Sequence, residues 1–389
     1  MAVLRELAGP GVELHPVVKG NAYGHGMIPI ARALAEIGVD GVCVAVFDEA
    51  AALRAAGVST PILVLFPIPA AFAAEARRQR IAVTASDREL LDELLAAVGR
   101  DAEDPPLEVH LELETGLGRG GFQANDAWQA ARDIAAAPGL RLAGAWTHLQ
   151  APEDASRSSR QLTTFEAITR DIEAQGVPVG RGHVSASGSL VLGEGFRGAA
   201  ARPGLATYGL IPDELLGPVV PAGSAARGRH PGSEGLRPIL SLRARPVRVA
   251  NLRAGTGISY GPTFTTSRTS RIATLPLGYG DGWSRALSNR AEALVRGTRV
   301  PLVGNVAMDS VMADVTDVPG DPVTVHDEFV LIGEQDGERI TAADVAKARG
   351  TNSWEVVTSF AARLPRVYHA ASVPRETRTL IGDAVPSSG

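Results

Sequence analysis

The sequence has one cysteine and no long apolar segment, and both absences narrow the class of protein. Cys43 has no second thiol with which to form an internal disulfide, and disulfides are typical of oxidising compartments. The N-terminus has no charged start followed by an apolar core and a small-residue cleavage site, as a secretory signal would have. No apolar run is long enough to span a membrane. We therefore expect a cytoplasmic protein without a membrane partner.

An excess of basic charge is also lacking. The 38 Lys and Arg residues against 43 Asp and Glu give a formal net charge of −5 and a pI of about 6.0. The basic residues are scattered, so we expect no nucleic-acid partner. The sequence contains no His and Cys cluster with metal-ligand spacing, no P-loop lysine and no GxGxxG after the first strand, so we expect no metal and none of the common nucleotide sites.

The first 210 residues repeat one pattern. A short run rich in Val, Ile and Leu is followed by a polar or glycine loop and then by a segment of helical periodicity. Eight such units predict a (β/α)8 barrel, whose chemistry lies in the loops after the carboxyl ends of the strands. A doubly wound open sheet would use the same elements in smaller number. The expected strands are Val12–Lys19, Gly41–Val46, Pro61–Phe66, Ile81–Ala85, Leu107–Glu112, Arg141–His148, Gly182–Ser187 and Gly198–Pro203, and the expected helices include Ile28–Ile37, Ala70–Gln79, Asp87–Val98, Asn125–Ala136 and Ser158–Gln175.

The character of the chain changes after Tyr208. We expect a barrel domain at residues 1–212, a loop or insertion rich in Gly, Pro, Ser and Arg at 213–235, and a mostly antiparallel β domain at 236–389. The tail after Ser372 is expected to be frayed. The expected strands of the second domain are Ile239–Leu252, Arg271–Leu277, Glu292–Arg296, Arg299–Val303 and Val323–Leu331, with one helix at Ala342–Arg349 that Thr341 caps.

Polar residues follow the predicted barrel strands at the end where chemistry is expected. A charged lysine at the end of a buried strand lowers stability, so its presence indicates a role. An apolar setting disfavours its charged form, so that the free amine can form a Schiff base with a carbonyl cofactor. A lysine with hydroxyl and glycine phosphate ligands suits pyridoxal 5′-phosphate, and the hydroxyls of Tyr23 and Ser187 with backbone N–H groups near Gly204 could hold a phosphate. The groups at this end are Lys19, Arg119, His148, Ser187 and Arg202.

At this point the sequence resembles a known family. The segment VVKGNAYGHG closely resembles the signature of alanine racemase, a fold-type-III pyridoxal-phosphate family, and the resemblance runs from about Val17 to Arg366. Motifs of the second domain match in order, which a barrel alone would lack. They are GISYG at 257–261, LGYGDGW at 277–283, MDS at 308–310 and LPRVY at 364–368.

The resemblance implies a role for each matching residue. Lys19 would carry the cofactor and act as a base on one face of the substrate Cα, and Tyr260 would act on the other face. The cofactor would be bound by Tyr23, His148, Ser187, Arg202, Gly204 and Leu205, and the substrate by Arg119 and the backbone of Met308, with Tyr279 and Asp309 at the entrance. The family's tyrosine and methionine come from the partner subunit, which implies a head-to-tail homodimer. The implied function is racemisation of alanine, a step that supplies D-alanine for peptidoglycan.

The implied pair of bases makes physical sense. Racemisation removes a proton from one side of Cα and returns one on the other. Lys and Tyr both titrate near about 10 in water, so their pKa must fall for either to accept a proton at neutral pH. Burial would lower the pKa of Lys19, and Arg119 would stabilise the phenolate of Tyr260. Arg202 facing the pyridine nitrogen would leave that nitrogen unprotonated and limit side reactions.

Four positions depart from the family pattern. Many members have a carbamylated lysine seven residues before the arginine that matches Arg119, and this position is Glu112. We expect Glu112 to replace the carbamate directly; alternatively, it merely faces the barrel interior. The usual Arg and Cys before Met308 appear as Asn305 and Ala307, and a tyrosine near the LPRVY motif is replaced around Ala362.

Other functions stay open at the level of the sequence. A racemase of another small amino acid such as serine would use the same groups, because one methylene changes discrimination by only about 1 to 3 kcal/mol. An inactive pyridoxal-phosphate-binding paralogue would keep Lys19 but would not need Tyr260. A basic amino-acid decarboxylase would use a cysteine at the shared site and an acidic partner for the pyridine nitrogen, and Arg202 argues against it. A purely structural protein would leave the polar strand ends unexplained.

Overall fold

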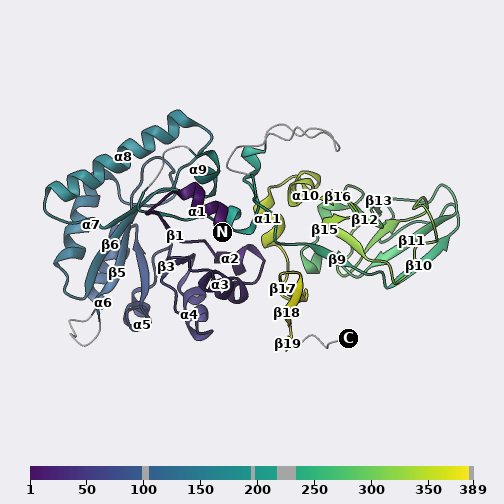
Figure 1. The fold of residues 1–389 in the computed structure, drawn as a ribbon, viewed down its shortest axis with the longest axis horizontal. Helices are drawn as coiled ribbons and strands as arrows, with labels where there is room; N and C mark the ends of the chain where they lie inside the picture. Colours follow the sequence, from purple (N-terminus) through teal and green to yellow (C-terminus); the bar gives the residue numbers. More distant parts are fainter. Residues whose placement is uncertain (99–104, 194–197, 217–233, 385–389) are drawn as a thin grey trace. The chain divides into compact units, whose positions relative to one another are not determined.

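The chain folds as two compact units in a computed structural model that describes residues 1–98, 105–193, 198–216 and 234–384 (Figure 1). The first unit spans Met1–Arg237 and the second Pro238–Gly389. Most of the connection expected at 213–235 lies outside the described residues. Its described start forms a short 3-10 helix, Asp213–Leu215, whose Leu215 is buried in the first unit.

Among its described residues, the first unit contains eight strands that pair in parallel. Six form one sheet in the order β2 to β7, and β1 pairs with β8. Two isolated bridges close the ring of strands. Val17, after β1, pairs with Cys43 of β2, and Ala186, after β7, pairs with Arg202, after β8. The bounds are β1 Glu13–Leu14, β2 Val42–Val44, β3 Ile62–Val64, β4 Ile81–Ala85, β5 Leu107–Glu112, β6 Leu140–Trp146, β7 Arg181–His183 and β8 Ala200–Ala201. The expected barrel is confirmed.

Helices alternate with these strands, and Figure 1 shows the long helices α7 and α8 side by side beyond β6. Their buried residues recur at helical spacing: Ala127, Ala130, Ala131 and Ile134 in α7, and Phe165, Ile168 and Ile172 in α8. The elements are α1 Ala2–Ala8, α2 Lys19–Tyr23, α3 Met27–Glu36, α4 Phe47–Ala55, η1 Ala70–Phe72, α5 Ala73–Arg78, α6 Arg88–Ala97, α7 Ala124–Ala136, α8 Ala155–Ala174, α9 Ser187–Leu192 and η2 Leu205–Tyr208.

The expected strand ends were wrong at four site residues. Lys19 does not end the first strand but opens α2, because the last ladder bond at this point runs from Val18 N–H to the Cys43 carbonyl at 2.8 Å. Ser187 does not end the seventh strand, which stops at His183, and instead opens α9. Likewise, His148 lies two residues beyond β6 and Arg202 directly after β8. The chemistry therefore lies in loops and first helical turns above the strands.

The second unit is built on one antiparallel sheet of eight strands in the order β10-β11-β14-β13-β12-β15-β16, with β9 paired to β15. Helices α10 Ala342–Arg349 and α11 Ser353–Thr358 pack on each other. The strands are β9 Leu242–Ala244, β10 Arg248–Leu252, β11 Ser270–Leu275, β12 Glu292–Val295, β13 Thr298–Val303, β14 Val311–Asp314, β15 Phe329–Gln335 and β16 Glu338–Ile340, and the short helices are η5 Tyr279–Asp281 and η6 Arg285–Leu287.

Several expectations for this unit need correction. The expected strand Ile239–Leu252 is broken between β9 and β10, and Val323–Leu331 is shifted, because the strand begins at Phe329. The tail after Ser372 is not frayed throughout: β17 Arg366–Ala370, β18 Val373–Thr379 and β19 Gly382–Ala384 form a three-stranded antiparallel sheet. The helix Ala342–Arg349 is confirmed with its cap, since Thr341 Oγ1 accepts the Asp344 N–H at 3.1 Å.

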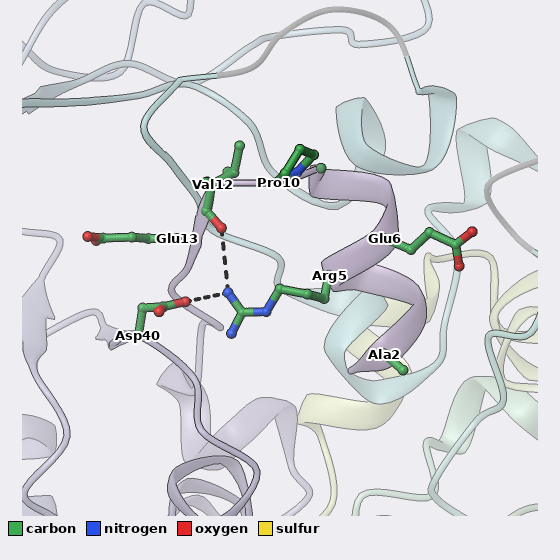
Figure 2. Close-up of a pocket in the computed structure, with 9 residues that line it drawn as sticks. Ala2, Arg5, Glu6, Pro10, Val12, Glu13 and Asp40 are labelled. Atoms are coloured by element: carbon green, nitrogen blue, oxygen red, sulfur yellow. Dashed lines mark hydrogen bonds and ion pairs between the residues drawn. The ribbon is translucent and has the colours of Figure 1, made fainter.

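A surface pocket of the first unit lies where the strands begin (Figure 2). Its floor holds the ion pair of Arg5, on α1, with Asp40 at 2.6 Å. Asp40 also accepts the Leu14 N–H at 2.8 Å and so ties α1 to β1. Because Glu13 begins β1 and Asp40 precedes β2, this pocket is at the opposite end of the barrel from Lys19.

Candidate active site

Lys19 lies half-buried at the carboxyl end of the first barrel strand, among groups of both charges. Burial lowers the pKa of its amine, and the positive charge of Arg119 lowers it further. The carboxylate of Glu49 and the thiol of Cys43 act in the opposite direction, while Arg202 again lowers the pKa. The Cys43 thiol is itself completely buried, and burial raises its pKa to about 12. Lys19 is therefore an amine whose neutral, nucleophilic form is favoured.

The turn after Lys19 has an unusual backbone. Gly20, Asn21, Ala22 and Tyr23 all have positive φ, at 60°, 55°, 54° and 52°. Left-handed geometry costs an L-residue about 1–2 kcal/mol, so three of these four residues are strained. Strained backbone of this kind persists where the surroundings over-determine it, and it gathers at functional sites. Here it leads from Lys19 to Tyr23, whose ring lies beside that of Tyr208.

Tyr23 and Ser187 converge on Gly204 from different parts of the sequence. Ser187 Oγ accepts the N–H groups of Gly204 and Ala206 at 2.9 and 3.1 Å. A Cβ on Gly204 would lie 2.5 Å from the Tyr23 hydroxyl, so glycine is required at this position. Burial raises the pKa of Tyr23 to about 12, which keeps its hydroxyl a hydrogen-bond donor. The backbone N–H of Leu205 donates to no acceptor among the described residues.

Arg202 is held in the barrel interior by fixed partners. Its guanidinium donates to the carbonyls of His183 and Thr147, both at 2.7 Å, and to His183 Nδ1 at 2.6 Å. It also lies over the ring of Trp146, with Cζ 4.9 Å from the centroid. Burial lowers the pKa of Arg202 to about 10, so the side chain remains a cation at neutral pH.

A chain of neutral imidazoles continues from Arg202. Because a guanidinium only donates, His183 Nδ1 must accept, and the ring proton of His183 resides on Nε2. That proton faces His110 Nδ1 at 2.9 Å. Burial lowers the pKa of His110 to about 3 and that of His183 well below its usual value, with Arg202 as a further cause. The chain fixes both tautomers and the orientation of the guanidinium.

Glu112 and Arg119 meet at the end of β5 and in the loop that follows. Glu112 is 5% exposed, and its Oε1 lies 3.5 Å from the Arg119 guanidinium. Burial raises the pKa of Glu112, and Arg119 opposes this shift. The loop that carries Arg119 is pinned by Glu114, which accepts the N–H groups of Leu117 and Gly118, both at 2.8 Å.

His148 completes this end of the barrel. Burial lowers its pKa to about 3, and the charges of Arg202, Arg119 and Lys19 contribute in that order. His148 is therefore neutral at physiological pH. The first unit thus brings together every barrel residue that the sequence singled out: Lys19, Tyr23, Glu112, Arg119, His148, Ser187, Arg202, Gly204 and Leu205.

The second unit brings three sequence motifs onto one surface. Tyr260 is 81% exposed, Met308 53% and Tyr279 45%. Asn305 Nδ2 donates to the carbonyls of Tyr260 and Gly261 at 2.8 and 3.1 Å, which fastens the GISYG turn to the segment before Met308.

The LGYGDGW motif is joined to the segment that contains Met308. The N–H groups of Tyr279 and Gly280 donate to the carbonyls of Ala307 and Met308 at 3.0 and 2.9 Å. A Cβ on Gly278 would lie 2.2 Å from the Ala307 carbonyl oxygen, so this approach requires glycine.

An arginine near the end of the chain fastens the same loops. Arg363 spans Asp281 and Asp309 with two hydrogen bonds of 2.7 Å each. Asp281 is buried and also accepts the Gly278 N–H at 2.8 Å. Asp309 is therefore oriented by Arg363, a residue that the sequence analysis did not single out.

Comparison with known proteins identifies the family. The profile described as "Alanine racemase, N-terminal domain" matches residues 1–212, and that described as "Alanine racemase, C-terminal domain" matches residues 239–368. The chain belongs to the alanine racemase family. "Alanine racemase 2" of Caldanaerobacter subterraneus subsp. tengcongensis is 36% identical over 368 residues, which cover 94% of this chain and 90% of that protein. The alanine racemase of Symbiobacterium thermophilum is 38% identical, covering 91% of this chain and 90% of the relative.

A solved alanine racemase has the same fold. The crystal structure of alanine racemase from Bacillus anthracis with bound L-Ala-P matches this chain with a TM-score of 0.85 and 31% sequence identity. The match covers 98% of this chain and 96% of that one. The expectation of an alanine racemase family member with a barrel and a β domain is therefore confirmed.

Some residues of this alanine racemase family site escaped the sequence analysis. His183 lies four residues before Ser187, but a single strand histidine carries no signal until the fold places it beside Arg202. Glu49 follows the second strand and contacts the turn after Lys19. Its position at the start of a helix, in the loop region where a barrel carries its chemistry, was the available signal. Among the residues that the structure describes, no cluster of metal-ligating side chains occurs, and no helix is long and apolar enough to cross a membrane.

Proposed function

We propose that this protein is a pyridoxal 5′-phosphate-dependent alanine racemase. The observation that carries the proposal is a half-buried Lys19 with a lowered pKa, next to hydroxyl and backbone groups that converge on Gly204. The family assignment supports it, because both family profiles and the named relatives are alanine racemases. A cytoplasmic location and a supply of D-alanine for peptidoglycan are parts of the same proposal.

The residues present fit the cofactor. Ser187 Oγ, the Tyr23 hydroxyl and the Leu205 N–H would offer hydrogen bonds to a phosphate beside Gly204, in a place that a Cβ would fill. Lys19 would hold the cofactor through Nζ, and Arg202 would face the pyridine nitrogen. When bound, pyridoxal phosphate withdraws electrons from the substrate Cα. The chain's own residues must then position the substrate and move protons.

Proton transfer needs one group on each face of Cα. Lys19 is suited to accept a proton at Nζ, since burial and Arg119 favour its neutral form. Tyr260 would use its phenolic oxygen on the opposite face. Arg119 would bind the substrate carboxylate, and the backbone of Met308 would hold the carboxylate from the other side. Tyr279 and Asp309 would line the entrance.

Arg202 would keep the pyridine nitrogen unprotonated. It is a cation whose N–H groups donate to His183 and Thr147. The rings of His183 and His110 behind it are neutral, so neither acts as an acid toward the pyridine nitrogen. His148, also neutral, would support the same side. This arrangement would restrict the spread of charge from Cα into the ring.

The exposure of the second unit's motifs supports a homodimer. Tyr260, Met308 and Tyr279 are apolar or aromatic groups on one exposed surface, and proton transfer in water-filled surroundings would be inefficient. We infer that a partner subunit's barrel covers them, so that each site uses Lys19 of one subunit and Tyr260 of the other.

Proton exchange at Cα tests the proposed activity. Purified protein with added pyridoxal phosphate is incubated with each L-amino acid in D2O. We expect deuterium at Cα and formation of the D-enantiomer with alanine, because both proton transfers occur at the same carbon. Serine exchanging faster than alanine would reassign the substrate within the same chemistry.

The controls use the two lysines of the chain, Lys19 and Lys347. Lys19→Ala is expected to abolish exchange, whereas Lys347→Ala, on α10 of the second unit, is expected to retain it. If borohydride fixes the cofactor on Lys19 while no amino acid exchanges, the protein is a cofactor-binding paralogue and the racemase proposal is wrong.

A further inference from the structure

The carboxylate of Glu49 accepts hydrogen bonds from the backbone that follows the first barrel strand and from the backbone that follows the second. Its Oε1 accepts the Gly20 N–H at 2.7 Å. Its Oε2 accepts the N–H groups of Ala45 at 2.8 Å and Val46 at 3.4 Å. One carboxylate therefore satisfies three backbone donors, and one of them belongs to the residue directly after Lys19.

The location of these bonds coincides with the end of strand pairing. The first strand pairs with the second as far as the bond from Val18 N–H to the Cys43 carbonyl. Beyond this bond, the two segments diverge into α2 and α4. Glu49, the third residue of α4, replaces the missing ladder bonds by joining Gly20 to Ala45.

The turn that follows Lys19 depends on such external bonds. Gly20, Asn21, Ala22 and Tyr23 are all left-handed, a geometry that L-residues adopt only under constraint. Asn21 fastens the far end of the turn, where its Oδ1 accepts the Met27 N–H at 2.8 Å. Glu49 fastens the near end, one peptide bond from Lys19.

We propose that Glu49 is a positioning residue for Lys19: its carboxylate fixes the strained turn and thereby aims Nζ at the cofactor. The inference rests on the proposed function, because it assigns Lys19 the cofactor. Glu49 touches neither substrate nor cofactor and acts through the backbone of Gly20.

The charge of Glu49 has a second, separable effect. The titratable and charged groups that act on Lys19 are Arg119, Glu49, Cys43 and Arg202. Glu49 raises the pKa of Lys19 against the effect of burial, so removal of its charge increases the share of neutral amine. A test of positioning must therefore be made where Lys19 is fully deprotonated in every variant.

The experiment measures how fast the cofactor becomes fixed on Lys19 without substrate. Glu49→Gln keeps the length of the side chain but offers one acceptor oxygen in place of two, and its NH2 group opposes a backbone donor. On the alkaline plateau of the pH profile, we expect borohydride-fixed cofactor on Lys19 to form about tenfold more slowly than in the wild type. The midpoint of the profile is expected to move to lower pH.

Asp87→Asn supplies a matched control. Asp87 belongs to the same unit and accepts two backbone N–H groups, those of Glu89 and Leu90, at the start of α6. It does not contact the turn after Lys19, so the fixation rate should equal that of the wild type.

An equal rate for Glu49→Gln on the plateau would overturn the positioning role. A wild type that never fixes cofactor on Lys19 would overturn the proposed function, and the inference with it.

A second measurement uses the wild-type chain and does not depend on a variant that folds. If Glu49 holds the turn, the Gly20 amide is protected from hydrogen exchange in the cofactor-free protein, although it lies in an exposed turn. Exchange of the Gly20 amide at the rate of a free loop amide would overturn the inference.

Discussion

Glu112 places a negative charge beside Arg119 by means of an ordinary carboxylate. In many family members, a carbamylated lysine occupies this position, and that modification requires dissolved CO2. Here the Glu112 oxygen already lies 3.5 Å from the guanidinium in a buried place. We propose that Glu112 replaces the carbamate and keeps Arg119 in position to bind the substrate carboxylate.

The activity should therefore not depend on bicarbonate. We expect equal initial rates of racemisation in CO2-depleted buffer and in buffer with added bicarbonate. Glu112→Gln should lower kcat/KM about tenfold, since a charge-assisted bond contributes about 1.5–3 kcal/mol and Arg119 is partly screened by water.

Glu108→Gln is the control for this prediction. Glu108 lies on the same strand and pairs with Arg141 on the surface, so its loss should leave the rate unchanged. Stimulation of the wild type by bicarbonate would contradict the replacement of a carbamate by Glu112.

At the scale of the elements, β5, β7 and the loop after β6 hold imidazoles that take up protons only at low pH. The pKa of His110 and of His148 is lowered to about 3 in the folded chain, against about 6.5 for histidine in an unfolded chain. Between these values the unfolded chain binds more protons than the folded one. Stability therefore falls as the pH drops from about 6.5 toward 3.

This difference predicts an acid-sensitive barrel. At pH 5, each of the two histidines should reduce the free energy of unfolding by about 2 kcal/mol relative to pH 7. His110→Asn keeps an acceptor for the His183 proton and should remove about 2 kcal/mol of that loss. Urea titrations at pH 5 and pH 7 measure the free energy of unfolding of each variant. His369→Asn, on the exposed strand β17, is the control, and an unchanged acid loss in His110→Asn would contradict the assigned protonation states.

The same scale shows what the sequence could predict about the fold. The barrel strands were predictable because Val, Ile and Leu runs alternate with helical segments. The strand β18, VPRETRT, was not, because it is polar and contains a proline, and it is stabilised by pairing with β17. Strand ends were missed at Lys19 and Ser187, since the backbone bonds that stop a strand come from residues distant in sequence.

The site was predictable to the extent that single residues carry the chemistry. Lys19, Arg119 and Arg202 stand out as charged groups after buried strands, and the family motifs add Tyr260 and Met308. Residues that act on other residues were not predictable. His183, Glu49 and Arg363 gain their roles only when folding brings them to Arg202, Gly20 and Asp309.

At the scale of the whole molecule, the proposal divides one active site between two compact units. The barrel unit would hold the cofactor, and the second unit presents Tyr260, which is 81% exposed, and Met308, which is 53% exposed. A head-to-tail dimer would place these groups over the partner's barrel and complete two equivalent sites. Two inactive variants should then repair each other.

Mixing subunits tests this central claim most directly. Lys19→Ala and Tyr260→Phe are each expected to lack racemase activity. When they are unfolded together in equal amounts and refolded, half of the dimers contain both variants, and one site in each such dimer has an intact Lys19 and an intact Tyr260. We predict about one quarter of the wild-type activity. Activity no higher than that of the separate variants, with dimers present, would contradict a shared two-base site.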